Sequence, residues 1–190
     1  MLDLLAEEVG ASGRTLRRAA TRGLIRAKRL SDRRFMMPAA ELAYVRRQWP
    51  LLSNLLEALR KQPNVRLAVL FGSAARGEER PESDLDLLVR LRRDDQETRA
   101  GIVDDLEAAG GRRVHLVSLA QAEEAPLLLA DVLADGRVLV DRDGDWLRLE
   151  HRRPRIARRA RAEDERLSEL AWSAPQALEE VRRGMAVGAR

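Results

Sequence analysis

The sequence predicts an α/β protein of the α+β type, in which helices precede and follow a mixed sheet. Two observations support this class. Residues 1–50 and 146–190 carry apolar side chains at helical spacing, which is typical of amphipathic helices. Between them lie short apolar, β-branched runs that read as strands, at residues 65–71, 84–89, 113–119 and 137–141. We therefore expect three parts, residues 1–50, 51–145 and 146–190.

The first predicted strand, residues 65–71, is almost entirely apolar and should be buried on both faces. It stops at Gly72, where the missing Cβ permits a sharp turn and the close approach of a ligand. We expect Ser73 to cap a helix that begins here, whose free N–H groups would attract phosphate. Arg76, about one turn further on, would then contact a phosphate oxygen.

The second predicted strand carries two carboxylates on one face. Residues 83–89 alternate, so that Asp84 and Asp86 share a face with Leu88 while the leucines between them face the other way. Carboxylates roughly 6 to 7 Å apart along a strand repel each other unless a cation lies between them. Magnesium suits such a pair, because it binds carboxylate and phosphate oxygens together.

Either half of this pattern alone has a simpler explanation. A Gly-Ser pair after a strand is usually only a turn, and an Asp-x-Asp sequence on a strand is more often an exposed edge. Here ten residues separate Gly72-Ser73 from Asp84-Leu85-Asp86, and apolar strands flank both. This combination favours a nucleotide site over a plain turn.

With Arg76-Gly77 inside the gap, the two motifs resemble the signature of the DNA polymerase beta-like nucleotidyltransferase superfamily, and in particular its minimal nucleotidyltransferases. The resemblance covers about residues 60–145. It implies that Gly72 and Ser73 hold the triphosphate of a nucleotide such as ATP, and that Asp84 and Asp86 bind Mg²⁺ or Mn²⁺. The implied reaction is attack of an acceptor hydroxyl on the α-phosphate with release of pyrophosphate, assisted by two metal ions.

The chain departs from the superfamily pattern at the third carboxylate, which belongs on the next strand. The polar residue at the expected point of residues 113–119 is His115. It can replace the carboxylate as a general base or as a ligand for a metal such as manganese. It can also leave a domain that binds nucleotide with little catalysis. If the strand alignment is wrong, a carboxylate of the preceding helical run would contribute instead, namely Asp104, Asp105 or Glu107.

Positive charge is concentrated in the first quarter of the chain. Residues 1–50 contain 11 Lys and Arg against 5 Asp and Glu, a net charge of +6. Residues 51–190 contain 24 Lys and Arg against 26 Asp and Glu, a net charge of −2, so the whole chain has a net charge of +4. Arginine is common throughout, since Lys28 and Lys61 are the two lysines among 35 basic residues. The clustering is therefore better evidence than the abundance. It indicates that the first part of the chain contacts nucleic acid.

The order of elements in residues 1–50 predicts a DNA-binding fold. A helical pattern ends at Gly10, and Ser12 is a good N-cap for a second helix over residues 13–20. Residues 4–47 resemble a MerR-type winged helix-turn-helix, with a wing at residues 31–34, which implies binding to double-stranded DNA. The candidate DNA contacts are Arg14, Thr15, Arg17, Arg18, Arg22, Arg33 and Arg34. The alternatives are solvated arginines or a surface that binds a partner protein.

The spacing of apolar residues and the positions of the prolines predict the other helices. We expect a helix over residues 38–47, an interruption at Pro50 and a new helix over residues 51–60. Residues 123–134 should be helical, and residues 142–145 a plain turn. From Trp146 a helix should cover the body or a partner through a stripe of apolar side chains, with a second short helix after Pro175. The stripe consists of Ile156, Leu167, Leu170 and Trp172.

Two functions follow from these patterns. The first is an enzyme that transfers a nucleoside monophosphate, AMP above all, from a nucleoside triphosphate to a hydroxyl of a protein or small molecule. Some minimal nucleotidyltransferases are antitoxins that modify a HEPN-family toxin, so a DNA-binding, autoregulated antitoxin fits both halves. The second is a transcriptional regulator whose nucleotidyltransferase-like domain only senses nucleotide, as His115 allows. A dimer on two DNA half-sites is expected by analogy with MerR proteins.

Composition limits the remaining possibilities. The chain of 190 residues has no uncharged apolar run long enough to cross a membrane and no positively charged signal-peptide opening, so we expect a cytoplasmic protein. It contains no cysteine, which excludes disulfides and thiolate metal sites.

Overall fold

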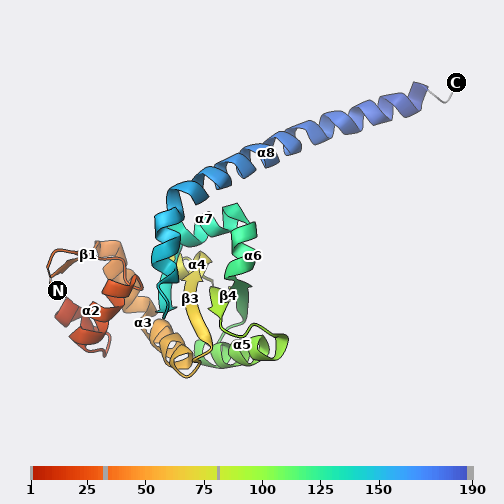
Figure 1. The fold of residues 1–190 in the computed structure, drawn as a ribbon. Coiled ribbons are helices and arrows are strands. Elements are labelled where there is room, and N and C mark those ends of the chain that lie inside the picture. The colour runs from red at the N-terminus through yellow and green to blue at the C-terminus, as the bar shows by residue number, and fades with distance from the viewer. Residues whose placement is uncertain (1, 32–33, 81, 188–190) are drawn as a thin grey trace.

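The fold has three regions in a computed structural model of the chain, which describes residues 2–31, 34–80 and 82–187, with side chains as far as residue 172. Helices of the amino-terminal region lie at one side of a body built on a four-stranded sheet (Figure 1). A long carboxy-terminal helix packs on the body and then extends away from it (Figure 1). The predicted class, helices around a mixed sheet, is confirmed.

The amino-terminal region is a helix, a turn and a second helix, followed by a small hairpin. Helix α1 (Leu2–Glu8) leads to α2 (Gly13–Arg22), and Ser12 caps α2 as expected by accepting the Thr15 N–H at 3.0 Å. The hairpin pairs β1 (Lys28–Arg29) with β2 (Phe35–Met36) where a wing was expected. Asp32 and Arg33 of its connection lie outside the described residues.

Helix α3 (Ala39–Arg60) is continuous, so the expected interruption at Pro50 is wrong. Proline removes one backbone donor and usually breaks a helix. Here the neighbours Trp49 and Leu52 are buried in the core, and their packing holds the helix on either side of the exposed proline. The expected division near residue 50 therefore falls inside one helix, and a single core cluster extends from Leu2 to Leu139.

The sheet has the strand order β5-β4-β3-β6. Strand β3 (Val65–Phe71) lies between β4 (Leu85–Leu91) and β6 (Arg137–Asp141), and it is antiparallel to both. Helix α5 (Gln96–Gly110) then returns the chain to β5 (Val114–Ser118), which pairs in parallel with β4. The sheet is thus mixed because a helix, and not a hairpin, connects β4 to β5.

Each face of the sheet is covered by helices, so alternate residues of β4 enter different cores. Leu85, Leu87 and Val89 pack with α3 and α5, whereas Leu88 packs with the other face. That second face is covered by α6 (Leu119–Glu124), α7 (Pro126–Asp135) and the start of α8. The helical character expected over 123–134 is confirmed except at Ala125, where Pro126 begins a new helix at its first turn.

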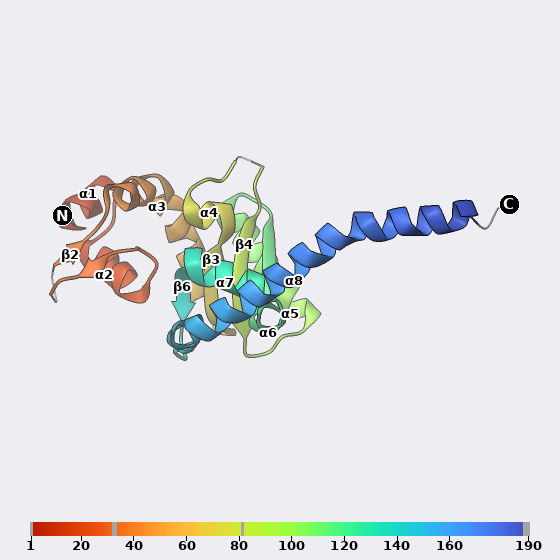
Figure 2. The same ribbon diagram turned by 90° about the horizontal axis from the view of Figure 1, so that it is seen from above.

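Helix α8 (Asp145–Val187) is one helix of 43 residues, and the second short helix expected after Pro175 is wrong. Its first turns pack on the body through Leu149 and Ile156. Beyond Ala160 it leaves the body, and Trp172 is 77% exposed (Figure 2). Of the predicted apolar stripe, only Ile156 covers the body. Among the described residues, no helix is both long and apolar enough to cross a membrane.

Candidate nucleotide and metal site

The turn after β3 brings backbone directly against a carboxylate. Helix α4 (Gly72–Arg76) begins where β3 ends, and Gly72 has φ of +71°. A Cβ placed on Gly72 would lie 2.7 Å from Oδ2 of Asp86, closer than real Cβ contacts permit. Both the positive φ and this approach require glycine. The motif therefore has a physical reason, because the turn and the Asp-x-Asp strand meet at this residue.

Ser73 does not cap α4, contrary to expectation. The N-cap position is Phe71, which makes no side-chain cap hydrogen bond, and Ser73 lies inside the five-residue helix. The chain turns one residue earlier than the sequence suggests, because Gly72 itself takes up the positive φ. The N–H groups at the start of α4 consequently have no side-chain acceptor at the cap position.

Asp84 and Asp86 lie at the start of β4, on the face opposite the buried Leu85 and Leu87, as the alternation predicts. The Asp86 side chain is 32% exposed, and that of Asp84 is 43% exposed. Asp84 forms an ion pair of 3.2 Å with Arg113 Nε, which is itself mostly exposed. Solvent screens such a pair, so it offers little resistance to an incoming cation.

His115 lies next to Asp86 on the neighbouring strand. The register of β4 and β5 pairs Asp86 with His115, and 3.3 Å separates Oδ1 of Asp86 from Nδ1 of His115. This is the place that the superfamily pattern gives to a third carboxylate. The carboxylates considered as substitutes are on α5, which covers the opposite face of the sheet. Two of them have other partners, since Asp105 accepts from Gln62 and Glu107 from the Val114 N–H.

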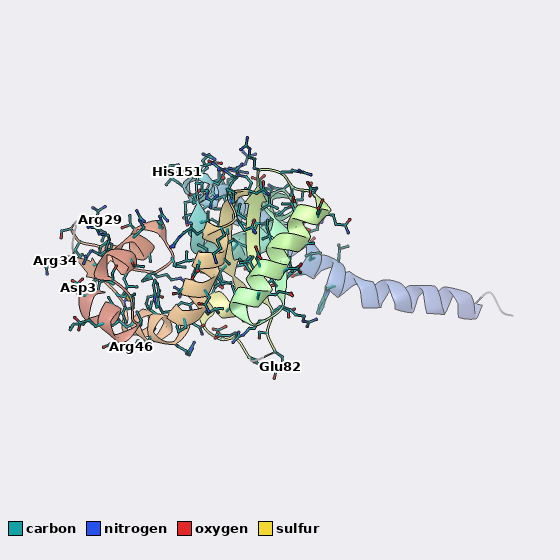
Figure 3. All side chains as sticks on the ribbon, turned by 90° about the horizontal axis from the view of Figure 1, so that it is seen from below. Asp3, Arg29, Arg34, Arg46, Glu82 and His151 are labelled. Carbon is teal, nitrogen blue, oxygen red and sulfur yellow. The ribbon has the colours of Figure 1, made fainter. Side chains whose placement is uncertain are left out.

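Arg76 is engaged by protein carboxylates. Its guanidinium donates to Glu78 at 2.7 Å and to Asp135 at 2.9 Å, and these bonds raise the pKa of Arg76. A phosphate would have to take the place of one of these carboxylates before Arg76 could bind it. The loop that follows α4 projects from the body, with Glu82 at its outer side (Figure 3).

Two carboxylates fit a magnesium ion that shares its coordination with phosphate. Magnesium binds one or two protein carboxylates and completes its octahedron with phosphate oxygens and water. The exposed Asp84 and Asp86, with Gly72 against the latter, provide such an arrangement. Within the described residues, no group of three or more acidic, His or Cys side chains is placed to hold a metal by itself.

A buried ion pair that the sequence did not reveal supports α4 from behind. Arg137, which is 1% exposed, donates to both carboxylate oxygens of Glu41, at 2.6 and 3.0 Å. It also donates to the Ala75 carbonyl of α4 at 2.6 Å and lies 3.4 Å from the centre of the Tyr44 ring. Tyr44 in turn donates to the Ala74 carbonyl, and burial raises its pKa to about 12. The sequence contains 33 arginines, and nothing in its pattern distinguishes Arg137 as the buried one.

The candidate DNA contacts do not share one open surface. Arg17 pairs with Asp3 at 2.8 Å, and the Thr15 hydroxyl lies 2.8 Å from that of Ser12. Arg34 is exposed at the outer edge of the amino-terminal region (Figure 3), and Arg33 lies outside the described residues. The remaining three line a cleft that faces the body, namely Arg14, Arg18 and Arg22.

Comparison with known proteins gives matches to the region that contains the site. Residues 53–145 match the family described as Polymerase beta, Nucleotidyltransferase. No curated protein matches the chain. Two similar solved structures are a toxin–antitoxin crystal structure with AMP-PNP, at 24% identity and a TM-score of 0.52, and a toxin–antitoxin MntA-HpeT mutant, at 22% identity and 0.53. Each match covers 64% of this chain and 98% of the other chain.

A third structure contains a tri-AMPylated Shewanella oneidensis HEPN toxin in complex with MNT antitoxin. It matches at 22% identity with a TM-score of 0.50, over 66% of this chain and 98% of the other. At such identities the likeness concerns the fold. Together with the family match and the mixed sheet, it shows that the middle of the chain has the polymerase beta-like nucleotidyltransferase fold.

Proposed function

We propose that this protein is a nucleotidyltransferase that transfers AMP from ATP to a hydroxyl of a protein or small molecule. The observation that carries the proposal is the contact of three motif residues: Gly72 touches the Asp86 carboxylate, and Asp86 touches His115. Packing alone does not account for this contact, because all three residues are partly or largely exposed. The family match and the similar toxin–antitoxin structures support the proposal.

Each residue has a role in this proposal. Gly72 and Ser73 present backbone N–H groups to the triphosphate. A side chain on Gly72 would collide with the Asp86 carboxylate and would occupy the space that a phosphate needs. Asp84 and Asp86 would hold Mg²⁺ or Mn²⁺, which when bound supplies charge neutralisation at the phosphates. Arg76, on exchanging Asp135 for phosphate, adds a guanidinium.

His115 takes the proton of the acceptor hydroxyl in this scheme. It is 66% exposed, so an acceptor can reach it, and its contact with the Asp86 carboxylate orients the imidazole. The same residue is the reason for the second candidate function, a nucleotide sensor. A histidine is a poorer magnesium ligand than a carboxylate, so a domain of this kind can bind nucleotide while transferring it slowly.

Transfer of label from α-³²P-ATP to candidate acceptors tests the enzyme. Asp86→Asn should abolish transfer, because the amide neither binds the cation nor contacts His115 as an anion. Asp104→Asn is the matched control, since Asp104 is exposed on the opposite side of the sheet. His115→Ala should reduce transfer by about 10²-fold or more, the usual effect of losing a general base.

Transfer by the unaltered protein, compared with transfer by His115→Asp, separates the two functions. Restoring a carboxylate at this position should raise transfer if the histidine limits an enzyme, and it should create transfer if the present protein is a sensor. If the unaltered protein binds nucleotide but transfers none with either Mg²⁺ or Mn²⁺, the enzyme proposal is wrong and the sensor function is favoured.

We further propose that the acceptor is a HEPN-type toxin and that the amino-terminal region binds double-stranded DNA, as in an autoregulated antitoxin. One similar structure contains an AMPylated HEPN toxin, which supports the first part. The basic helix-turn-helix and hairpin support the second. Joint substitution by Glu of Arg17 and Arg34, which lie outside the cleft that faces the body, should abolish salt-dependent duplex binding in a mobility-shift assay, and Arg155→Glu on exposed α8 should not.

A further inference from the structure

A cleft of about 320 Å³ separates the second helix of the amino-terminal region from the body. One wall is α2, and the other is formed by the end of α3 and the edge strand β6. The backbone bond from the Val138 N–H to the Gly23 carbonyl, 3.3 Å long, joins the two walls. The volume is at the small end of the range for pockets that bind small molecules, roughly 300 to 1,000 Å³.

Four guanidinium groups line this cleft without protein partners. Arg14, Arg18 and Arg22 follow one another at intervals of four on one face of α2, and Arg60 extends from the last turn of α3. Within the described part of the chain, none of the four side chains forms a hydrogen bond or an ion pair. Many other arginines of this protein are paired, as Arg46 is with Glu8 and Arg66 with Asp143.

The acid that lines the cleft does not neutralise them. Both oxygens of Asp141 are used at the start of α8, where they accept from the Asp145 N–H at 2.9 Å and the Trp146 N–H at 3.3 Å. Arg142, the remaining arginine of the lining, donates to the Leu59 and Gln62 carbonyls at the end of α3. With five arginines and one carboxylate the lining has a net charge of +4, which favours a ligand with several negative charges.

The other part of the lining is apolar, and it includes Leu24, Leu56 and Val138. A simple inorganic anion would leave this surface in contact with water. A ligand with phosphate at one end and an apolar or aromatic group at the other matches both halves of the cleft.

We propose that this cleft is a second binding site, for a small organic phosphate of nucleotide size. Its phosphates contact Arg18, Arg22 and Arg60, and its apolar part lies on Leu56 and Val138. The cleft shares no lining residue with the Gly72–Asp86 site. Duplex DNA is not the occupant, because a major groove takes up a whole helix and here the body faces the arginine side of α2.

Calorimetric titration of ATP and AMP tests the proposal. The protein used is the full chain carrying Asp84→Asn and Asp86→Asn, in excess EDTA, so that the metal-dependent site is silent. We expect one nucleotide to bind per chain, with affinity falling as salt rises. Joint Arg18→Ala and Arg60→Ala, both exposed positions whose folding is checked by thermal melting, should weaken binding at least about tenfold. Arg155→Ala, also exposed but remote from the cleft, should leave it unchanged.

Absence of nucleotide binding under these conditions would overturn the proposal, as would binding that the Arg18 and Arg60 changes leave intact. A duplex that binds through these arginines while ATP and AMP do not would assign them to DNA instead. The test does not depend on catalysis, because every titration uses protein in which Asp84 and Asp86 are replaced by Asn.

Discussion

The two regions that flank the nucleotidyltransferase domain are attached to it in opposite ways. The amino-terminal region shares a core with the sheet and is joined to it by the buried Glu41–Arg137 pair. The distal half of α8 has exposed leucines and an exposed tryptophan, and it projects from the body (Figure 2). A displacement of the first region would reach α4 through Arg137 and Tyr44, whereas the described apolar side chains of distal α8 are exposed to solvent.

This difference shows where regulation of the site can originate. Arg137 donates to the Ala75 carbonyl, three residues from Gly72, and also to the Leu24 carbonyl at the end of α2. A ligand that binds the amino-terminal region is therefore connected to the turn at Gly72 by two hydrogen bonds of Arg137, one to the Leu24 carbonyl and one to the Ala75 carbonyl. Four predictions sharpen the comparison, beginning with the largest expected effect.

Arg137→Ala should lower the free energy of unfolding by about 3 to 5 kcal/mol, because it leaves the Glu41 carboxylate buried and unpaired. Urea unfolding measures the loss. The double variant Arg137→Met with Glu41→Leu is the control, and it should cost less than the sum of its parts. If the double variant loses as much stability as the two single substitutions added together, the Glu41–Arg137 pair does not join the two regions.

Ile156→Ala and Leu170→Ala compare the two halves of α8. Ile156 is buried against the body, so its truncation should cost about 2 to 5 kcal/mol. Leu170 is 58% exposed, and its truncation should change the stability by less than about 0.5 kcal/mol. A large effect of Leu170→Ala, dependent on protein concentration, would instead reveal that distal α8 is covered in solution.

Tyr44→Phe should cost about 1 kcal/mol, because it removes the hydroxyl that donates to the Ala74 carbonyl and keeps the ring beside Arg137. The contribution is also pH-dependent. Burial raises the pKa of Tyr44 to about 12, so the stability it gives is complete below pH 10 and is lost as the pH rises toward 12. Unfolding midpoints from pH 8 to pH 11 should fall less in Tyr44→Phe than in the unaltered protein.

Asp143→Asn should have the smallest effect, at the turn before α8. Hydrogen bonds from Arg66, and then from Arg90, hold the pKa of Asp143 well below its ordinary value of 3.8. A lowered pKa stabilises the folded state above pH 3.8, and this contribution is lost as the pH falls below that value. The difference in urea midpoint between the two proteins should therefore shrink between pH 5 and pH 2. A constant difference would mean that the charge of Asp143 does not matter.

Much of the site could be predicted because its information is local. The end of β3 at Gly72 follows from an apolar run that meets a glycine, and the shared face of Asp84 and Asp86 follows from the period of a strand. His115 was found because the next strand had one polar residue at the corresponding point. The expected N-cap role of Ser73 was wrong, since the positive φ of Gly72 begins the helix one residue early.

The continuity of α3 and α8 could not be read from the sequence, because proline signals a break and distant packing decides otherwise. The positions of the arginines were equally hidden. Arg14 and Arg17 look alike in the sequence, yet one lines a cleft and the other pairs with Asp3.

The sequence by itself determined the elements and the chemistry of the nucleotide site, since strand alternation and glycine freedom act within a few residues. Only the tertiary structure decided which arginines are buried, paired or free. Ion pairs such as Glu41–Arg137 join residues 96 positions apart, and their partners are selected by how the helices pack on the sheet. The same packing placed four arginines around one cleft, where none of them pairs with another described residue.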